Sequence, residues 1–334
     1  MANGDTTPSR VGQINSAGAV DALFLKKFAG EILTTFEENN VFKDLHTMRT
    51  IENGKSAQFP VTGIATASYY TPGQNIADSG NSYLSDIKKN EVVITIDDVL
   101  LASTFLSSID DVKNHYDIRS VYANEIGKAL ALRFDTAIAK VFIAAARSAA
   151  TITGGKDDAD STDPTGAELV AALFTAAQGL DENDVPADGR FCVLRPQEYY
   201  KLITGGSGSL VISTSASNKD VGGSGSLASG SIAQVAGIDI HKSTHIPSTD
   251  LSAVATGDGA ASNDVFGGGG SGYNADFRET IGIVAHPSAV GTVKLLDLAT
   301  ESEYQISRQG TLFIAKYAMG HGILRPEAAI ELQK

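Results

Sequence analysis

The stretch that decides the fold of this chain reads Val293-Lys-Leu-Leu-Asp-Leu298 and then Phe313-Ile-Ala-Lys-Tyr-Ala-Met-Gly-His-Gly-Ile-Leu-Arg-Pro-Glu-Ala-Ala329. It carries no catalytic apparatus. Its histidine, His321, stands between Gly320 and Gly322, and flanking glycines indicate a close approach of the backbone or an unusual φ/ψ pair. We therefore interpret His321 as part of a structural turn rather than as a ligand.

Three earlier blocks accompany this stretch: Gly54-Lys-Ser-Ala-Gln-Phe-Pro-Val61, Val93-Ile-Thr-Ile-Asp97 and Asn114-His-Tyr-Asp-Ile-Arg-Ser120. In sequence and in order, the four blocks resemble the major capsid (head) protein of short-tailed bacteriophages of the T-seven type, a group of podoviruses and autographiviruses. The resemblance extends over essentially the full length and weakens between about Ala150 and Phe277.

The resemblance implies an α+β chain with the tailed-phage and herpesvirus type of major capsid protein fold. The implied parts are an N-terminal arm with an amphipathic helix over residues 1–55, an extended β-ribbon (E-loop) over 56–108, a peripheral domain with a long spine helix over 109–150 and 286–334, and an axial domain with Gly/Ser-rich loops over 151–285.

The resemblance also implies a structural subunit and not an enzyme. Such subunits self-assemble as hexamers and pentamers into an icosahedral head that encloses double-stranded DNA. The implied partners are further copies of the chain, a scaffolding protein during assembly, a portal protein at one vertex, and packaged DNA through non-specific proximity only. The implied location is the virion, after assembly in the host cytoplasm, with no cofactor, metal or membrane.

Composition is compatible with this interpretation. Of 334 residues 42% are apolar, which is typical of a globular protein, and the net charge is −13. Wrapping of nucleic acid needs clustered Lys and Arg, so the acidic balance argues against it. The single cysteine, Cys192, excludes an intrachain disulfide and lies in an apolar run typical of a buried core. The chain has no long apolar run and no signal-peptide pattern, so we expect neither membrane insertion nor secretion.

Two segments have helical periodicity. Ala19–Asn39 predicts an amphipathic arm helix, and Asp110–Ala149 predicts a spine helix about 60 Å long. Ser108 and Asp111 resemble a capping box at the start of the spine. The predicted buried face of the spine comprises Val112, Tyr116, Ala123, Ile126, Leu130, Phe134, Ile138, Val141 and Ala145.

Alternating apolar residues predict two paired strands near Ala57–Val61 and Val92–Ile96, with Pro60 on an edge strand. Their connection, Gly63–Asn90, is far longer than a hairpin loop, and such length is usually functional. Its tyrosines follow no helical or strand period. We expect these tyrosines and the arm phenylalanines to contact neighbouring subunits; the predicted contact residues are Phe24, Phe28, Phe36, Tyr69, Tyr70 and Tyr83.

The second half of the chain predicts alternating helices and strands, interrupted by Gly/Ser-rich stretches. Thr165 and Glu168 resemble a capping box before a short helix. Order returns at Ser231–Ile240 after a glycine-rich region. The other predicted elements are a strand over Arg190–Leu194, a helix over Pro196–Ile203, and strands over Ile281–Ala285, Val290–Leu296, Tyr304–Arg308, Thr311–Tyr317 and Ala329–Leu332.

Other functions were weighed against this interpretation. An α/β hydrolase needs a pocket of convergent ionisable groups, and a β-rich decoration or adhesin protein does not need a long helix. His241 and His245 are spaced as metal ligands only if helical, and we expect a strand there. The glycine-rich stretches lack the Gly-Lys-Ser/Thr of a phosphate loop. The sequence Lys88-Lys89-Asn90 contains the residue types that form lysine–asparagine isopeptide crosslinks between subunits in some capsids. We interpret it instead as a solvated charge run.

Overall fold

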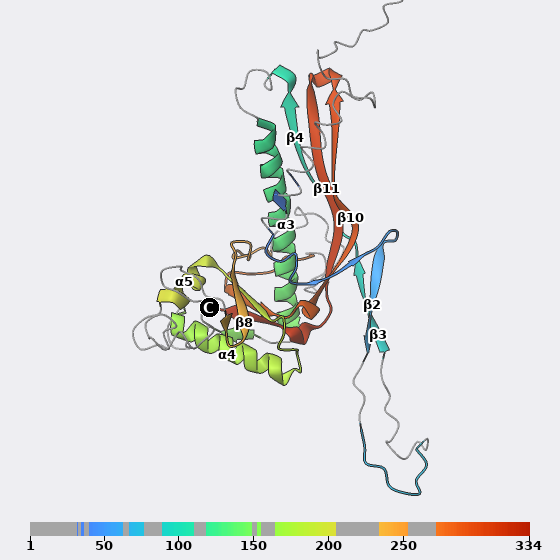
Figure 1. Ribbon diagram of the computed structural model, residues 1–334, viewed down its shortest axis with the longest axis vertical. Coiled ribbons are helices and arrows are strands. Elements are labelled where there is room, and N and C mark those ends of the chain that lie inside the picture. Colours follow the sequence, from blue (N-terminus) through green and yellow to red (C-terminus); the bar gives the residue numbers. More distant parts are fainter. Residues whose placement is uncertain are drawn as a thin grey trace, which may run out of the picture. The chain divides into compact units, whose positions relative to one another are not determined.

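A computed structural model of the chain describes residues 32, 35–36, 40–62, 67–76, 89–109, 118–148, 152–154, 164–204, 234–252 and 272–334 (Figure 1). By its internal contacts the chain divides into two units. Unit 1 comprises Met1–Asn40, Leu100–Arg133 and Asp297–Tyr317, and unit 2 comprises Val41–Val99, Phe134–Leu296 and Ala318–Lys334. The division into arm, ribbon, peripheral and axial parts stays a prediction.

Helices and strands are mixed along the chain, as expected for an α+β fold. The helices are α3 (Ile118–Ser148), α4 (Gly166–Glu182) and α5 (Pro196–Thr204), with short 3₁₀ turns η2 (Pro287–Ala289), η3 (Ile306–Arg308) and η4 (Pro326–Ala328). The strands are β1 (Thr47–Thr50), β2 (Ser56–Thr62), β3 (Lys89–Thr95), β4 (Leu100–Ser107), β5 (Ile152–Gly154), β6 (Phe191–Leu194), β7 (Gln234–Val235), β8 (Ile238–Lys242), β9 (Thr280–Ala285), β10 (Val290–Gln305), β11 (Gly310–Ile323) and β12 (Ala329–Gln333).

Unit 1 joins the end of the predicted arm to the first part of α3. Ile32 and Phe36 are 0% and 7% exposed, and Thr35 Oγ1 donates a hydrogen bond to Asn124 Oδ1 at 2.6 Å. Gly127 permits this close contact, because a Cβ at that position would lie only 2.9 Å from the Thr35 Cβ. A glycine in the middle of the helix is therefore explained by packing.

The predicted spine is confirmed as α3, which is about 46 Å long at 1.5 Å per residue. Its described part begins at Ile118, so the predicted start, with Val112, Tyr116 and the cap at Asp111, lies outside the described residues. The remaining members of the predicted face are all buried: Ala123, Ile126, Leu130, Phe134, Ile138, Val141 and Ala145.

Unit 2 contains a six-stranded sheet with the order β5-β12-β9-β6-β8-β7. Every residue of the central strands β6 and β9 is buried, as in sheets covered on both faces. Phe142 of α3 packs edge-on against Phe191 of β6, with ring centroids 5.5 Å apart.

Cys192 is 0% exposed and burial raises the pKa of its thiol, so the prediction of a core cysteine is confirmed.

Helix α4 begins with the predicted capping box. The Thr165 hydroxyl accepts a hydrogen bond from Glu168 N, and the Glu168 carboxylate accepts one from Thr165 N. Each side chain thus satisfies a backbone N–H that the first helical turn leaves without an intrahelical partner. The apolar face of α4 is buried, and the helix contacts α5, β12 and β7.

Asp135 of α3 joins three segments of unit 2. Its carboxylate is 0% exposed and accepts hydrogen bonds from Val41 N at 2.7 Å and Phe42 N at 3.3 Å. His245 Nδ1 lies 2.8 Å from the same carboxylate. His245 is therefore a structural partner of Asp135, whereas His241 is exposed on β8, as expected for residues that leave a strand.

A buried ion pair fixes the end of α3 to β12. Glu331 is 0% exposed and accepts hydrogen bonds from Arg147 Nε at 2.7 Å and from Arg147 Nη2 at 2.8 Å. Thr280 Oγ1 donates to the same carboxylate at 2.5 Å. A buried charge needs such complete pairing, because water no longer solvates it.

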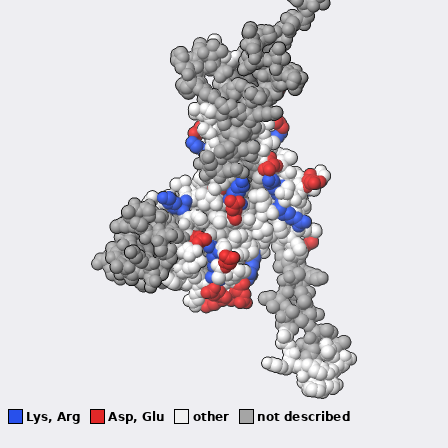
Figure 2. Space-filling view, in the orientation of Figure 1, with Lys and Arg blue, Asp and Glu red and all other residues white. Residues whose placement is uncertain are grey.

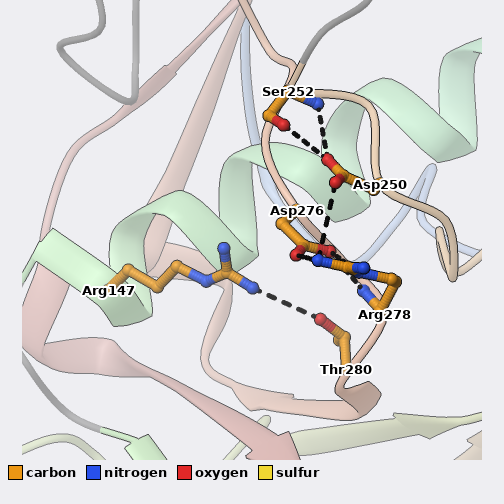
Figure 3. A network of polar contacts seen from close by, with 6 residues as sticks. All are labelled: Arg147, Asp250, Ser252, Asp276, Arg278 and Thr280. Atoms are coloured by element: carbon orange, nitrogen blue, oxygen red, sulfur yellow. Dashed lines mark hydrogen bonds and ion pairs between the residues drawn. The ribbon is translucent and has the colours of Figure 1, made fainter.

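A second polar network lies beside Arg147 and Thr280, as Figure 3 shows. Asp276 forms an ion pair with Arg278, whose Nη2 also lies 3.5 Å from Asp250 Oδ2. Asp250 Oδ1 accepts a hydrogen bond from Ser252 N at 3.0 Å. These bonds hold the pKa of both aspartates below its ordinary value, mainly through Arg278 for Asp276 and through Ser252 for Asp250. The network joins the two chain segments that flank residues 253–271.

The Gly-His-Gly sequence lies inside strand β11, so the interpretation as a turn is wrong. A Cβ at Gly320 would overlap the Thr95 carbonyl oxygen, and a Cβ at Gly322 would lie 2.8 Å from Ile94 Cγ1. Neither glycine has a positive φ. The predicted close approach of the backbone is confirmed, and no unusual φ/ψ pair is needed.

His321 is a buried core residue of unit 2. Its Nδ1 lies 2.9 Å from Thr292 Oγ1, and its ring packs edge-on against Phe134 with centroids 5.7 Å apart. Burial, together with a smaller contribution from the nearby His46, lowers the pKa of His321 to about 3. The folded subunit therefore keeps this imidazole neutral at pH values where the unfolded chain, with an ordinary pKa of 6.5, is protonated.

We expect the unassembled subunit to lose stability as the pH falls below 6.5, because protons then bind the unfolded chain preferentially. The free energy of unfolding should fall by about 1.4 kcal/mol per pH unit from His321 alone. Urea denaturation at several pH values between 7 and 5 measures this slope. His321→Gln should flatten it, with the exposed His241→Gln as control. An equal slope in wild type and His321→Gln would contradict the assignment.

Three strand predictions need correction. The predicted strand Tyr304–Arg308 is wrong, because β10 continues to Gln305 and η3 follows at Ile306–Arg308. The strands predicted over Val290–Leu296 and Thr311–Tyr317 exist but are longer, as β10 and β11. Sequence reasoning missed β1 and β4, which pair with β10 and β11 at the two edges of a four-stranded sheet.

Candidate assembly surface

The base of the predicted ribbon is an antiparallel pair, β2 with β3, in which Ala57 faces Ile94 and Thr62 faces Lys89. One face of the pair belongs to a core cluster of unit 2. Ala57, Ile94 and Ile96 are buried there with Val293 and Ala318. Because side chains alternate between faces, this burial fixes the register of the ribbon.

The opposite face of the ribbon is exposed. Gln58 and Glu91 lie on it, with Gln58 Nε2 donating to Glu91 Oε1 at 3.3 Å, and Val93 beside them is 46% exposed. Pro60 pairs opposite Glu91 in a sheet of two strands, both of which are edges, so the edge prediction is confirmed. Among the described residues, the ribbon is thus anchored to its own subunit through the face that carries Ala57 and Ile94, and Arg49 Nη1 also donates to the Gln58 carbonyl at 2.7 Å.

The described part of the connection, residues 67–76, is here called the tip. Every residue of the tip is exposed, and none is charged. Figure 2 shows the tip as surface without acidic or basic side chains. Tyr69 is 102% exposed, Tyr70 51% and Ile76 54%. Exposed aromatic and aliphatic side chains grouped without charges are characteristic of the centre of a protein interface.

The tip has an ordered turn of its own. Gln74 N donates to the Thr71 carbonyl at 3.2 Å across Pro72 and Gly73, and Gly73 has φ +94°. Proline followed by a glycine with positive φ is typical of a type II turn. The Tyr70 hydroxyl donates to the Gln74 carbonyl at 2.9 Å and accepts from Gly73 N at 3.3 Å.

The other predicted contact residues are placed as follows. Phe36 is 7% exposed and lies 6.3 Å from the Tyr317 ring of its own unit, edge to face. Phe24, Phe28 and Tyr83 lie outside the described residues. Sequence reasoning missed Ile76, although an isoleucine in a stretch without charged residues, 67–76, was a signal for it. The role of all these residues in contacts between subunits stays a prediction.

Features that would support other chemistry are weak in the described part of the chain. Within it, no three His, Cys, Asp or Glu side chains are grouped so as to hold a metal ion. A hollow beside α4 is lined by Phe174, Ala177, Gln178, Asp181, Glu182 and Ala236. Its ionisable groups are two carboxylates that already have partners: Asp181 pairs with Arg190 at 2.7 Å, and Glu182 accepts a hydrogen bond from Gln178 Nε2 at 2.8 Å.

Comparison with known proteins gives a consistent result. Residues 58–333 match the profile of the Gp10A-like family, described as major capsid protein. The chain is 36% identical to the major capsid protein of Escherichia phage T7, over 94% of this chain and 92% of that protein. It is 34% identical to the major capsid protein of Enterobacteria phage T3, over 98% and 97%.

Solved structures agree. The capsid of cyanophage P-SCSP1u is similar with a TM-score of 0.71 and 40% identity, over 98% of each chain. The mature capsid of bacteriophage PhiM1 is similar in fold with a TM-score of 0.64 and 18% identity, over 88% of this chain and 86% of that one. The fold is therefore that of the tailed-phage capsid proteins. The chain belongs to the Gp10A-like major capsid protein family.

Family membership makes this chain a structural protein of the virion capsid, which is not an enzyme. The hydrolase and the decoration or adhesin alternatives are thereby set aside. Among the described residues, no helix is both long enough and apolar enough to cross a membrane.

Proposed function

We propose that copies of this chain assemble as hexamers and pentamers into an icosahedral head that encloses double-stranded DNA. The observation that carries the proposal is the tip: an uncharged, exposed segment that presents Tyr69, Tyr70 and Ile76 to solvent, beyond a ribbon whose base is anchored in its own subunit. Such exposed apolar surface stabilises an assembly when another molecule covers it and removes it from water. In a capsid protein, the covering molecule is a second copy.

The arm and the ribbon are the parts that reach neighbouring subunits in this proposal. Tyr69 and Tyr70 make the tip contact, with Tyr83 further along the same connection. Phe24, Phe28 and Phe36 make a second contact through the arm. The peripheral domain, built on α3 and residues 286–334, and the axial domain over residues 151–285 complete each hexamer and pentamer.

Further partners act before and after the shell closes. A scaffolding protein guides assembly, a portal protein occupies one vertex, and packaged DNA lies near the inner surface without specific contacts. The net charge of −13 supports the last point, because acidic subunits repel the phosphate backbone. It also makes subunits repel one another, so added salt should promote assembly by screening them.

Electron microscopy of the wild-type chain, expressed alone and with the scaffolding protein of its phage, tests the proposal. We expect closed shells, or hexamers and pentamers as intermediates. Analytical ultracentrifugation of the same samples gives their mass. A monodisperse monomer at high concentration in both preparations would contradict the proposed function.

A further inference from the structure

The two neighbouring tyrosines of the tip have different environments. Tyr69 is 102% exposed, whereas Tyr70 is 51% exposed and its hydroxyl bonds to the backbone of Gly73 and Gln74. The two rings therefore differ in how much of their surface a partner can cover. Tyr69 has its whole ring available to a partner, and Tyr70 uses its polar end inside its own loop.

We propose that Tyr70 is a positioning residue that holds the tip in its docking conformation, and that Tyr69 is the side chain that docks onto a second copy of this chain. The inference rests on the proposed function for its partner and deepens it by assigning separate roles within the tip. It concerns only residues 67–76.

The physical reason lies in the cost of ordering a loop. A free loop loses conformational entropy when it binds, and a loop already held in the bound shape loses less. The hydrogen bonds that hold the turn include one across Thr71–Gln74 and two to the Tyr70 hydroxyl. Pro72 fixes its own φ, and glycine adopts the positive φ of Gly73 at little cost. The tip therefore pays much of its ordering entropy before it meets a neighbour.

The occupant is a second copy rather than nucleic acid or a charged partner. The tip carries no charged residue, so it has no group that would pair with phosphate or with an acidic or basic peptide. Its exposed side chains include the aromatic ring of Tyr69 and the aliphatic Ile76 beside uncharged polar residues. The apolar ones desolvate readily against another apolar protein surface. The proposed function, an assembly of many copies of this chain, brings the surfaces of further copies within reach of each tip.

Four single variants of the full-length chain separate the two roles. Tyr70→Phe removes only the hydroxyl that bonds the turn. Gly73→Ala adds a Cβ to open space, since no atom lies within 4 Å of it, so its effect acts only through the positive φ. Tyr69→Ala removes the docking ring. Tyr69→Phe is the matched control for Tyr70→Phe, because it removes a hydroxyl from the neighbouring position and keeps the ring.

Two readouts are needed. Hydrogen exchange of the unassembled subunit, followed by mass spectrometry at residues 67–76, reports the turn through the amides of Gly73 and Gln74. Light scattering with electron microscopy reports the rate and yield of shells. Tyr70→Phe and Gly73→Ala should speed hydrogen exchange at the amides of Gly73 and Gln74. Each should also weaken association between subunits by about threefold to tenfold per contact. Tyr69→Ala should weaken association by at least tenfold with unchanged exchange. Tyr69→Phe should match wild type in both.

Each other outcome overturns part of the inference. Faster exchange in Tyr70→Phe with normal assembly would show that preorganisation has no role. Slower assembly with unchanged exchange would show that the Tyr70 hydroxyl contacts the neighbour itself. Normal assembly of Tyr69→Ala would remove Tyr69 as the docking group. If wild type forms no shells, the proposed function fails, while the exchange data still decide whether Tyr70 holds the turn.

Discussion

Ile126→Pro is expected to abolish shell formation, because it breaks α3 within its first half. Ile126 is 7% exposed within α3, next to Gly127, where Thr35 packs against the helix. Proline has no N–H for the i−4 hydrogen bond, and its ring clashes with the carbonyl of Tyr122 one turn earlier. The cost is about 3 kcal/mol or more. A kink here would also displace the contact between the arm and the helix in unit 1.

Ile126→Leu is the matched control for this prediction. It keeps the volume and the apolar character, so its cost should stay below about 1.5 kcal/mol and shells should form normally. Thermal unfolding of the unassembled subunit and electron microscopy of the assembled product measure the two effects. Equal shell yields from the proline variant and wild type would refute the assignment of α3 as a structural spine.

Removal of the ribbon connection is expected to leave a folded subunit that does not close shells. Thr62 pairs with Lys89, so residues 63–88 can be replaced by Asn-Gly, a sequence that favours a two-residue hairpin turn. The core side of the ribbon, with Ala57 and Ile94, stays intact in this variant. The variant loses the whole tip, including its exposed side chains.

A control connection of equal length separates the effect of the length of the connection from the effect of its side chains. Replacement of residues 63–88 by a flexible Gly/Ser segment of the same length keeps the reach of the connection and removes Tyr69 and the turn. We expect this control to fold and to assemble as poorly as the Asn-Gly variant. Normal shells from the control would show that length alone suffices, and the role given to the tip side chains would then be wrong.

Several elements could be predicted from sequence because their signals are local. The buried face of α3 follows from a helical repeat sustained over many turns, and the cap of α4 from Thr165 and Glu168. The ribbon follows from alternating apolar residues on β2 and β3. In each case the chain segment itself contains the pattern that packing uses.

Other elements depend on partners that are distant in sequence. Residues 298–305, the second half of β10, are mostly polar, and none of them is buried. This half has no alternation of apolar residues that would predict a strand. The strand continues to Gln305 because it pairs with β11. All of β1 is exposed, and β1 is a strand because it pairs with β10. Gly320 signalled a close approach, but only the fold shows that the Thr95 carbonyl fills the space.

The place of the candidate site could be predicted from local sequence signals, but its hydrogen bonds could not. Unpatterned tyrosines in an overlong connection pointed to the tip, and the Pro72-Gly73 pair is a local turn signal. The hydrogen bonds from the Tyr70 hydroxyl to Gly73 and Gln74 were not predictable, because many ring orientations are compatible with the same sequence. They separate the roles of two adjacent tyrosines that the sequence alone treats as equivalent.

Electron microscopy of the Asn-Gly variant beside wild type tests most directly the claim that the tip joins subunits into a shell. Circular dichroism and thermal unfolding of the same samples establish whether the variant is folded. We expect a wild-type spectrum with a cooperative melt and no closed shells from the variant. Normal shells from the folded variant would contradict the account, and a variant that does not fold would place residues 63–88 in the core of the subunit itself.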